Sequence, residues 1–192
     1  MIRLRNILTE VISEIGDRVT TDNIVDTKIG NTRSSITVEI GEDIIEVEFR
    51  LKEGENYANI LSRDIKTQDV YKFIKSSKFA EEDDEWGFIE VSFFIVEDDP
   101  TYDMSNRGNP LEVMSAVSGA VSEFLKQYRY VDVMGLMFSG KEEFDGDRRR
   151  ERLYNKFTER NIKSIARGEI RKTELVYGDK YILYYSDKPL NG

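Results

Sequence analysis

The chain has 192 residues, a formal net charge of −9 and a charged fraction of 34%, so it fits one domain and its long-range field repels nucleic-acid backbones. It contains no cysteine and no histidine, which excludes disulfides, thiolate sites, histidine bases and histidine metal sites. Acid–base chemistry must therefore use Asp, Glu, Tyr or Lys. We predict no metal site, and any metal ion would have to be bound by oxygen ligands. No window approaches the roughly 18 apolar residues of a membrane span, so we expect no membrane association.

Residues 1–16 are predicted to form an amphipathic helix that ends at Gly16. Its apolar side chains recur at helical spacing: Leu4, Ile7, Leu8, Val11, Ile12 and Ile15. Such a helix usually covers a sheet face, and the alternative is docking to a partner. The next residues, 17–31, are polar and stay unassigned, apart from a turn at Gly30 and Asn31.

Residues 35–52 alternate between apolar and polar side chains, which predicts a two-stranded hairpin. The apolar positions are Ile36, Val38 and Ile40 in the first strand and Ile45, Val47, Phe49 and Leu51 in the second. Gly41 and Glu42 suit a two-residue type II′ turn, with glycine at the position that needs a positive φ.

The stretch from 54 to 85 is harder to interpret. Residues 67–76 are predicted to form a short helix around an apolar cluster. Residues 81–85 form an unbroken acidic run. Such a run is usually a solvated loop, and it would hold a cation only if further ligands converged on it.

Residues 88–96 are aromatic or β-branched on both faces, which predicts a strand in the centre of a sheet. Glu90 is the one charged residue of this strand. It points to solvent, pairs with a basic residue, or serves as a general base.

Residues 109–128 are predicted to form a helix that Asn109 caps and Pro110 begins, with Glu112 at capping-box spacing. The expected buried stripe is Met114, Val117, Val121, Phe124, Leu125 and Tyr128. Small residues between 115 and 120 predict that this helix approaches a sheet or a neighbouring helix closely.

Residues 131–139 are predicted to form a second central strand, and a polar loop over 140–146 leads to a helix that continues to residue 165. The first turn of that helix carries three arginines and a fourth follows it, although cations at a helix start oppose its dipole. These are Arg148, Arg149, Arg150 and Arg152. They either bind an anion or pair with the acidic residues nearby. A hairpin over 169–186, turning at Gly178 and Asp179, closes the domain, and residues 190–192 form a tail.

The order of these elements resembles the GNAT acyltransferase superfamily. The resemblance implies a single α/β (α+β) domain over residues 1–192, with a GNAT-like mixed, mostly antiparallel central sheet flanked by helices. In that family the strand–loop–helix step binds the pyrophosphate of acetyl-CoA on N–H groups at the helix start. The next strand splays from its neighbour and opens a slot for the pantetheine arm.

Particular residues carry this resemblance. The phosphate-binding positions would be Arg107, Gly108, Asn109 and Leu111. Tyr154 would protonate the leaving thiolate, unless it is a core residue, and Glu90 or a water would take the amine proton. The loop departs from the family motif at Pro110, where a glycine is expected, and proline removes one N–H from the site.

A second resemblance covers roughly residues 88–160. The run from Asn106 to Met114, the triplet Phe138-Ser139-Gly140 and the pair Leu153-Tyr154 are similar to a family of small uncharacterised proteins from tailed bacteriophages. This similarity implies a phage or prophage origin, and it implies no established activity.

Three functions follow from these observations. The one we favour is a phage-encoded GNAT-like protein without catalysis, either a virion component or an inhibitor that binds a host or defence protein through its acidic surface. The second is an acetyl-CoA-dependent N-acyltransferase, so acetyl-CoA is the one possible cofactor. The third is a phosphate-ligand binder that uses Arg107, Arg148, Arg149 and Arg152, because consecutive helix starts between parallel strands lie at one sheet edge. We expect a protein partner rather than nucleic acid, and a location in the host cytoplasm or the virion.

Overall fold

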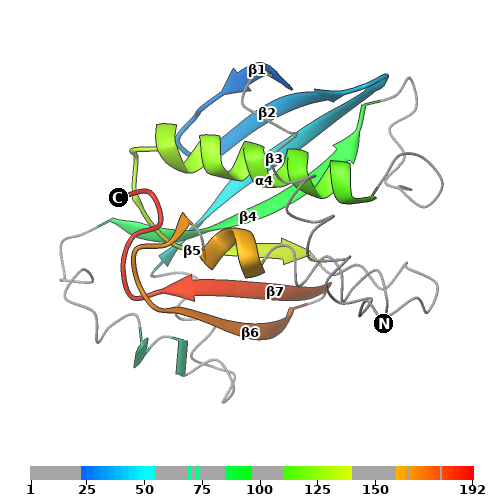
Figure 1. The fold of residues 1–192 in the computed structure, drawn as a ribbon. Helices are drawn as coiled ribbons and strands as arrows, with labels where there is room; N and C mark the ends of the chain where they lie inside the picture. The colour runs from blue at the N-terminus through cyan, green and yellow to red at the C-terminus, as the bar shows by residue number, and fades with distance from the viewer. Residues whose placement is uncertain are drawn as a thin grey trace, which may run out of the picture.

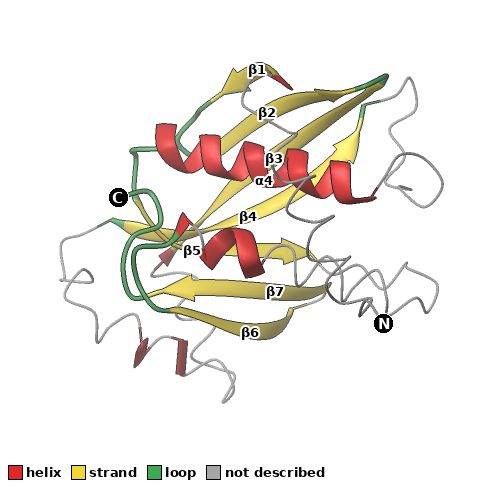
Figure 2. Cartoon of the chain, viewed as in Figure 1, coloured by secondary structure: helices red, strands yellow, loops and turns green. Residues whose placement is uncertain are grey.

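One mixed sheet organises the molecule, with strand order β1-β2-β3-β4-β5-β7-β6 (Figures 1 and 2). The computed structural model describes residues 23–54, 69–70, 72–73, 85–96, 110–139, 159–163, 165–177 and 179–192. Its strands are β1 Ile24–Lys28, β2 Arg33–Ile40, β3 Asp43–Glu53, β4 Trp86–Ile95, β5 Asp132–Ser139, β6 Ile170–Tyr177 and β7 Asp179–Ser186. Neighbouring strands are antiparallel except β4 and β5, which are parallel. The helix α4, Pro110–Gln127, connects these two strands. The expected mixed, mostly antiparallel α/β architecture is therefore present in the described part of the chain.

The hairpin expected over residues 35–52 is present as β2 and β3. Ile40 pairs with Asp43, so two residues form the turn. Gly41 has a φ of 61°, whereas Glu42 has a negative φ, as a type II′ turn requires. The predicted apolar positions of both strands are buried or partly buried in the core that α4 covers.

The first strand, β1, lies within residues 17–31, for which the sequence predicted no element besides a turn. β1 pairs with β2 at the sheet edge, and an extra residue between Ile24 and Asp26 bulges out of the ladder. Its residues are exposed or half-buried, so no apolar alternation marks it. The predicted turn follows, and the Ser34 hydroxyl bridges it by donating to the Gly30 carbonyl and accepting from the Gly30 N–H, both at 3.1 Å.

The helix α4 lies across β2 and β3 on one face of the sheet (Figure 1). The predicted apolar stripe is buried throughout. The Phe124 ring stacks on Phe49 of β3, with ring centroids 4.2 Å apart and an interplanar angle of 5°. The small residues Ser115, Ala116 and Ala120 are buried as well. Their burial agrees with the prediction that this side of α4 approaches its neighbours closely.

The sheet is buried on both faces where β4 and β5 meet. Phe88 and Ile89 are adjacent and point to opposite faces, yet both are at most 1% exposed. Gly87 pairs with Val133 and Phe88 with Gly135, so Met134 is an extra, bulged residue of β5. A Cβ at Gly135 would lie 2.5 Å from the Tyr184 carbonyl oxygen, which makes glycine necessary there.

The face opposite α4 carries a second core cluster, whose buried members are Val70, Phe88, Met134, Met137, Leu183 and Tyr185. Residues 69, 70, 72 and 73 are helical, within the helix predicted over 67–76. The Phe73 ring meets Tyr185 edge-on at 5.5 Å. The Arg171 guanidinium lies 3.9 Å from the centre of the Phe73 ring.

The C-terminal hairpin is present as β6 and β7, but Asp179 pairs with Tyr177 instead of belonging to the turn. The predicted tail over 190–192 is wrong, because Leu190 and Asn191 are buried. Figure 1 shows the C-terminus beside the end of α4. The Asn191 side chain donates to the carbonyls of Tyr128 and Val131 at 3.0 and 2.9 Å, and accepts from the Val133 N–H at 2.9 Å.

Candidate functional site

The structure describes two of the residues expected to form the site. Glu90 lies in β4, and Leu111 lies in the first turn of α4. The other expected site residues lie outside the described part of the chain: Arg107, Gly108, Asn109, Arg148, Arg149 and Tyr154. The same holds for Arg152, for the N-terminal helix over 1–16 and for all of the acidic run except Glu85.

Glu90 is held by an ion pair. Its Oε2 lies 2.8 Å from Nζ of Lys52 on β3, and the side chains of Lys52 and Glu90 are 34% and 15% exposed. Its neighbours Ile89 and Val91 belong to the core under α4, so Glu90 points to the opposite face of the sheet. The pairing with a basic residue, one of the alternatives open from the sequence, is what the structure contains.

The parallel pair and its connecting helix define one edge of the sheet. α4 leaves β4 and returns to β5, so it begins near the carboxyl ends of both strands. The ladder between them ends at Val91 and Phe138. Beyond that point β4 continues to Ile95 alongside β3, where Ile95 pairs with Ile45.

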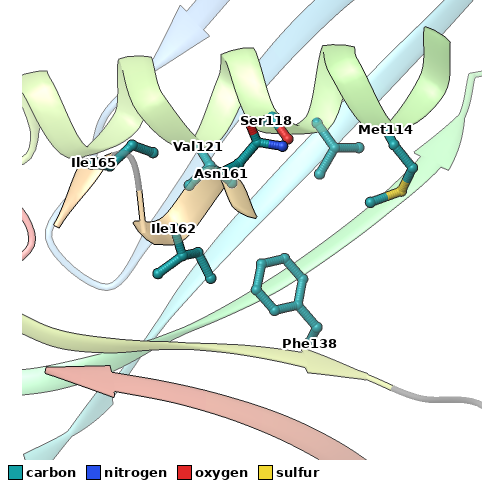
Figure 3. A pocket seen from close by; sticks show the side chains of 8 residues that line it. Met114, Ser118, Val121, Phe138, Asn161, Ile162 and Ile165 are labelled. Carbon is teal, nitrogen blue, oxygen red and sulfur yellow. The ribbon is translucent and has the colours of Figure 1, made fainter. Parts of the chain in front are cut away.

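A small pocket lies on the α4 side of this edge. It contains about 270 Å³ of space outside protein atoms, part of it open to solvent, and its lining comes from α4, β5 and residues 159–165. The lining residues are Met114, Val117, Ser118, Val121, Phe138, Asn161, Ile162 and Ile165. Figure 3 shows the Phe138 ring pointing from β5 toward α4, between Met114 and Ile162 in this view.

The pocket is mainly apolar, with Ser118 and Asn161 as its polar side chains. No pattern in the sequence predicts this pocket. The one related feature of the sequence is the small residue Ser118 on α4, which we expected to allow close packing of this helix. Ser118 instead leaves space between α4 and the segment that carries Ile162 (Figure 3).

A tyrosine next to the pocket, Tyr184, is also absent from the site residues predicted from the sequence. Tyr184 on β7 meets the Phe138 ring edge-on, with centroids 6.1 Å apart. Burial, and secondarily the Glu159 carboxylate, raises the pKa of Tyr184 far above its usual value. Its phenol therefore stays protonated at neutral pH. Lys163, 2.6 Å from Glu159, lowers the pKa of that carboxyl by hydrogen bonding.

Other kinds of site have no support among the described residues. They contain no group of three or more acidic residues placed to hold a metal ion. Within the same residues, no helix is long and apolar enough to cross a membrane. Comparisons of the chain with protein-family models, curated proteins and solved structures gave no match.

Proposed function

We propose that this chain is a non-catalytic binding protein on an acyltransferase-like scaffold. The observation that carries the proposal is the position of Glu90. A general base must come within hydrogen-bond reach of the proton it takes. Glu90 points away from the α4-side pocket, and Lys52 holds its carboxylate at 2.8 Å.

The pocket supports binding rather than catalysis. Its space of about 270 Å³ includes open solvent, so the pocket is a shallow depression and not a cavity that encloses a small-molecule ligand. It offers an apolar wall with one hydroxyl and one amide, and the described lining contains no charged side chain. Such a site suits a single apolar side chain of a protein partner, the kind of anchor that dominates many interfaces.

The fold supports the scaffold part of the proposal. The parallel β4–α4–β5 unit stands in a mostly antiparallel sheet, which is the strand–helix–strand step that the GNAT resemblance implies. The similarity to tailed-phage proteins directs the search for a partner to virion and host proteins. Mass spectrometry of purified particles should detect the chain if it is a virion component, and particles without it would restrict the partner to a host protein.

The second candidate is the acetyl-CoA-dependent N-acyltransferase. One observation favours it: α4 begins at the carboxyl edge of the parallel pair, with Leu111 in its first turn. N–H groups at such a helix start are suited to phosphate.

An acetyl-transfer assay separates the two candidates, with polyamine and peptide amines as acceptors. We expect no transfer above the rate without protein. Two variants make the test specific. Glu90→Gln removes the candidate base, whereas Lys52→Met breaks the ion pair and keeps the carboxylate. Transfer that Glu90→Gln abolishes and Lys52→Met retains would establish the enzyme and overturn our proposal.

A further inference from the structure

Two arginines lie directly opposite each other on the sheet face that points away from α4. Arg33 of β2 pairs in register with Arg50 of β3. The Leu51 N–H donates to the Thr32 carbonyl at 3.0 Å, so the next pair along the ladder, Arg33 and Arg50, is a non-hydrogen-bonded pair, in which opposite side chains come closest. Phe49, the residue before Arg50, stacks on a ring of α4. Both arginines therefore point to the other face.

The neighbouring side chains compensate only part of this charge, although like charges in such a pair destabilise a sheet. Nη2 of Arg50 lies 2.8 Å from Oε2 of Glu48. Glu90 lies opposite Arg50 in the ladder, but its carboxylate is 2.8 Å from the amine of Lys52. Within the part of the chain that the structure describes, Arg33 has no ion-pair partner. Three cationic side chains thus stand beside two carboxylates, and one positive charge is in excess.

The Arg50 guanidinium also has unused hydrogen-bonding capacity. Glu48 accepts a hydrogen bond from its Nη2, whereas its Nε is buried and has no hydrogen-bond partner, the one such side-chain atom among the described residues. A buried donor without an acceptor destabilises a fold. The Arg50 side chain is nevertheless 42% exposed, and Arg33 is exposed, so a ligand can reach both guanidinium groups. Arginine binds carboxylates and phosphates through pairs of N–H groups.

The excess charge decides between these two ligands. One positive charge matches a carboxylate, whereas a phosphate group, which is close to a dianion at neutral pH, would leave the cluster negative beside Glu48 and Glu90. Exposed ion pairs are weak, so the site suits one contact within an interface rather than a free acid. We propose that Arg33 and Arg50 together bind an Asp or Glu carboxylate of a protein partner. This contact rests on the proposed binding function and adds to it a recognition site on the face opposite the pocket.

A titration of the full chain tests the site without the partner. The probe is N-acetyl-glutamate amide, which presents one carboxylate, and N-acetyl-glutamine amide is its neutral match. Both are added at constant ionic strength while the arginine side-chain signals are followed by NMR. We expect the charged probe alone to shift the Arg33 and Arg50 signals saturably, with a Kd of about 100 mM or below. Shifts that stay linear, or that are equal for the two probes, would overturn the proposal, and a site already filled by carboxylates of the chain itself would give that result.

Two variants make the titration specific. Arg33→Gln alters an exposed side chain and should weaken probe binding at Arg50 by at least about threefold. The control is Lys28→Gln, because Lys28 lies on the same face, opposite Ser35, and its amine is 3.0 Å from Asp26; its affinity for the probe should match the parent's. An equal loss in both variants would indicate general charge attraction and overturn the site, as would unchanged affinity in Arg33→Gln. Such a failure would not affect the proposed function, whose pocket lies on the other face and whose test is acetyl transfer.

Discussion

The buried side chain of Asn191 ties the C-terminus to the junction between α4 and β5, and replacing it by alanine should destabilise the protein. Its three hydrogen bonds, to Tyr128, Val131 and Val133, are 2.9–3.0 Å long. The side chain is 9% exposed, so water does not simply replace it. The variant should therefore weaken the whole fold rather than release a loose end.

The magnitude follows from the partners left behind. The Tyr128 carbonyl keeps a bond from the Arg129 guanidinium at 2.8 Å, so its loss is small. The Val133 N–H and the Val131 carbonyl lose the partners that Asn191 gave them. At about 1 kcal/mol for each net hydrogen bond and somewhat more for a stranded buried group, we expect Asn191→Ala to lower the free energy of unfolding by about 3 kcal/mol. For a chain of this size that corresponds to a Tm decrease of roughly 6–12 °C.

Urea denaturation at pH 7 measures this change, with the slope m compared between variants. Asn31→Ala is the matched control, because the Asn31 side chain is exposed and its loss should cost less than about 0.5 kcal/mol. A loss below about 1 kcal/mol for Asn191→Ala at unchanged m would refute the claim that the C-terminus is an integral part of the fold.

Two further predictions concern the core. Gly135→Ala should destabilise the protein by about 3 kcal/mol or more, since its Cβ would lie 2.5 Å from the Tyr184 carbonyl oxygen and overpacking is costly; a circular-dichroism melt with a Tm within 3 °C of the parent would contradict the bulge geometry. Burial raises the pKa of Tyr128 from 10.0 to about 12, so this tyrosine contributes stability that is complete below pH 10 and is lost as the pH rises toward 12. Tyr128→Phe should cost about 1 kcal/mol at pH 7, through the lost 2.7 Å bond to the Asn31 carbonyl, but its stability should fall less between pH 10 and 12; parallel stability curves over that range would show that Tyr128 does not titrate as described.

Local patterns predicted those parts of the fold that depend on local physics. The β2–β3 hairpin follows from strict alternation and from a glycine that supplies the positive φ. The buried stripe of α4 follows from helical spacing. In the hairpin the two pairing strands are adjacent in the chain, and in α4 the spacing of apolar residues within the helix is enough to define its buried side.

The missed features depend on distant partners. β1 has no apolar alternation and is a strand because the edge of β2 pairs with it. Asn191 looked like part of a tail, because the groups it binds lie 58–63 positions away in the chain. An isolated sequence gives no means of recognising such contacts.

The same distinction holds for the candidate site. In the sequence, Glu90 stands out as the one charged residue of an apolar strand, and an ion pair with a basic residue was one of the predicted alternatives. The sequence could not identify Lys52, because that contact depends on the register that sets Lys52 beside Phe88 and Arg50 beside Glu90. The pocket depends on how closely residues 159–165 approach α4, which no local pattern encodes. The phosphate-binding and arginine residues stay predictions, because they lie outside the described part of the chain.

Calorimetric titration of the full chain with acetyl-CoA tests the central claim most directly. We predict no heat beyond dilution up to millimolar cofactor, because the described pocket is small and apolar and Pro110 stands at the start of α4. A saturable heat with a Kd below about 1 mM, a binding free energy stronger than about −4 kcal/mol, would contradict the account of a binding protein that does not use this cofactor.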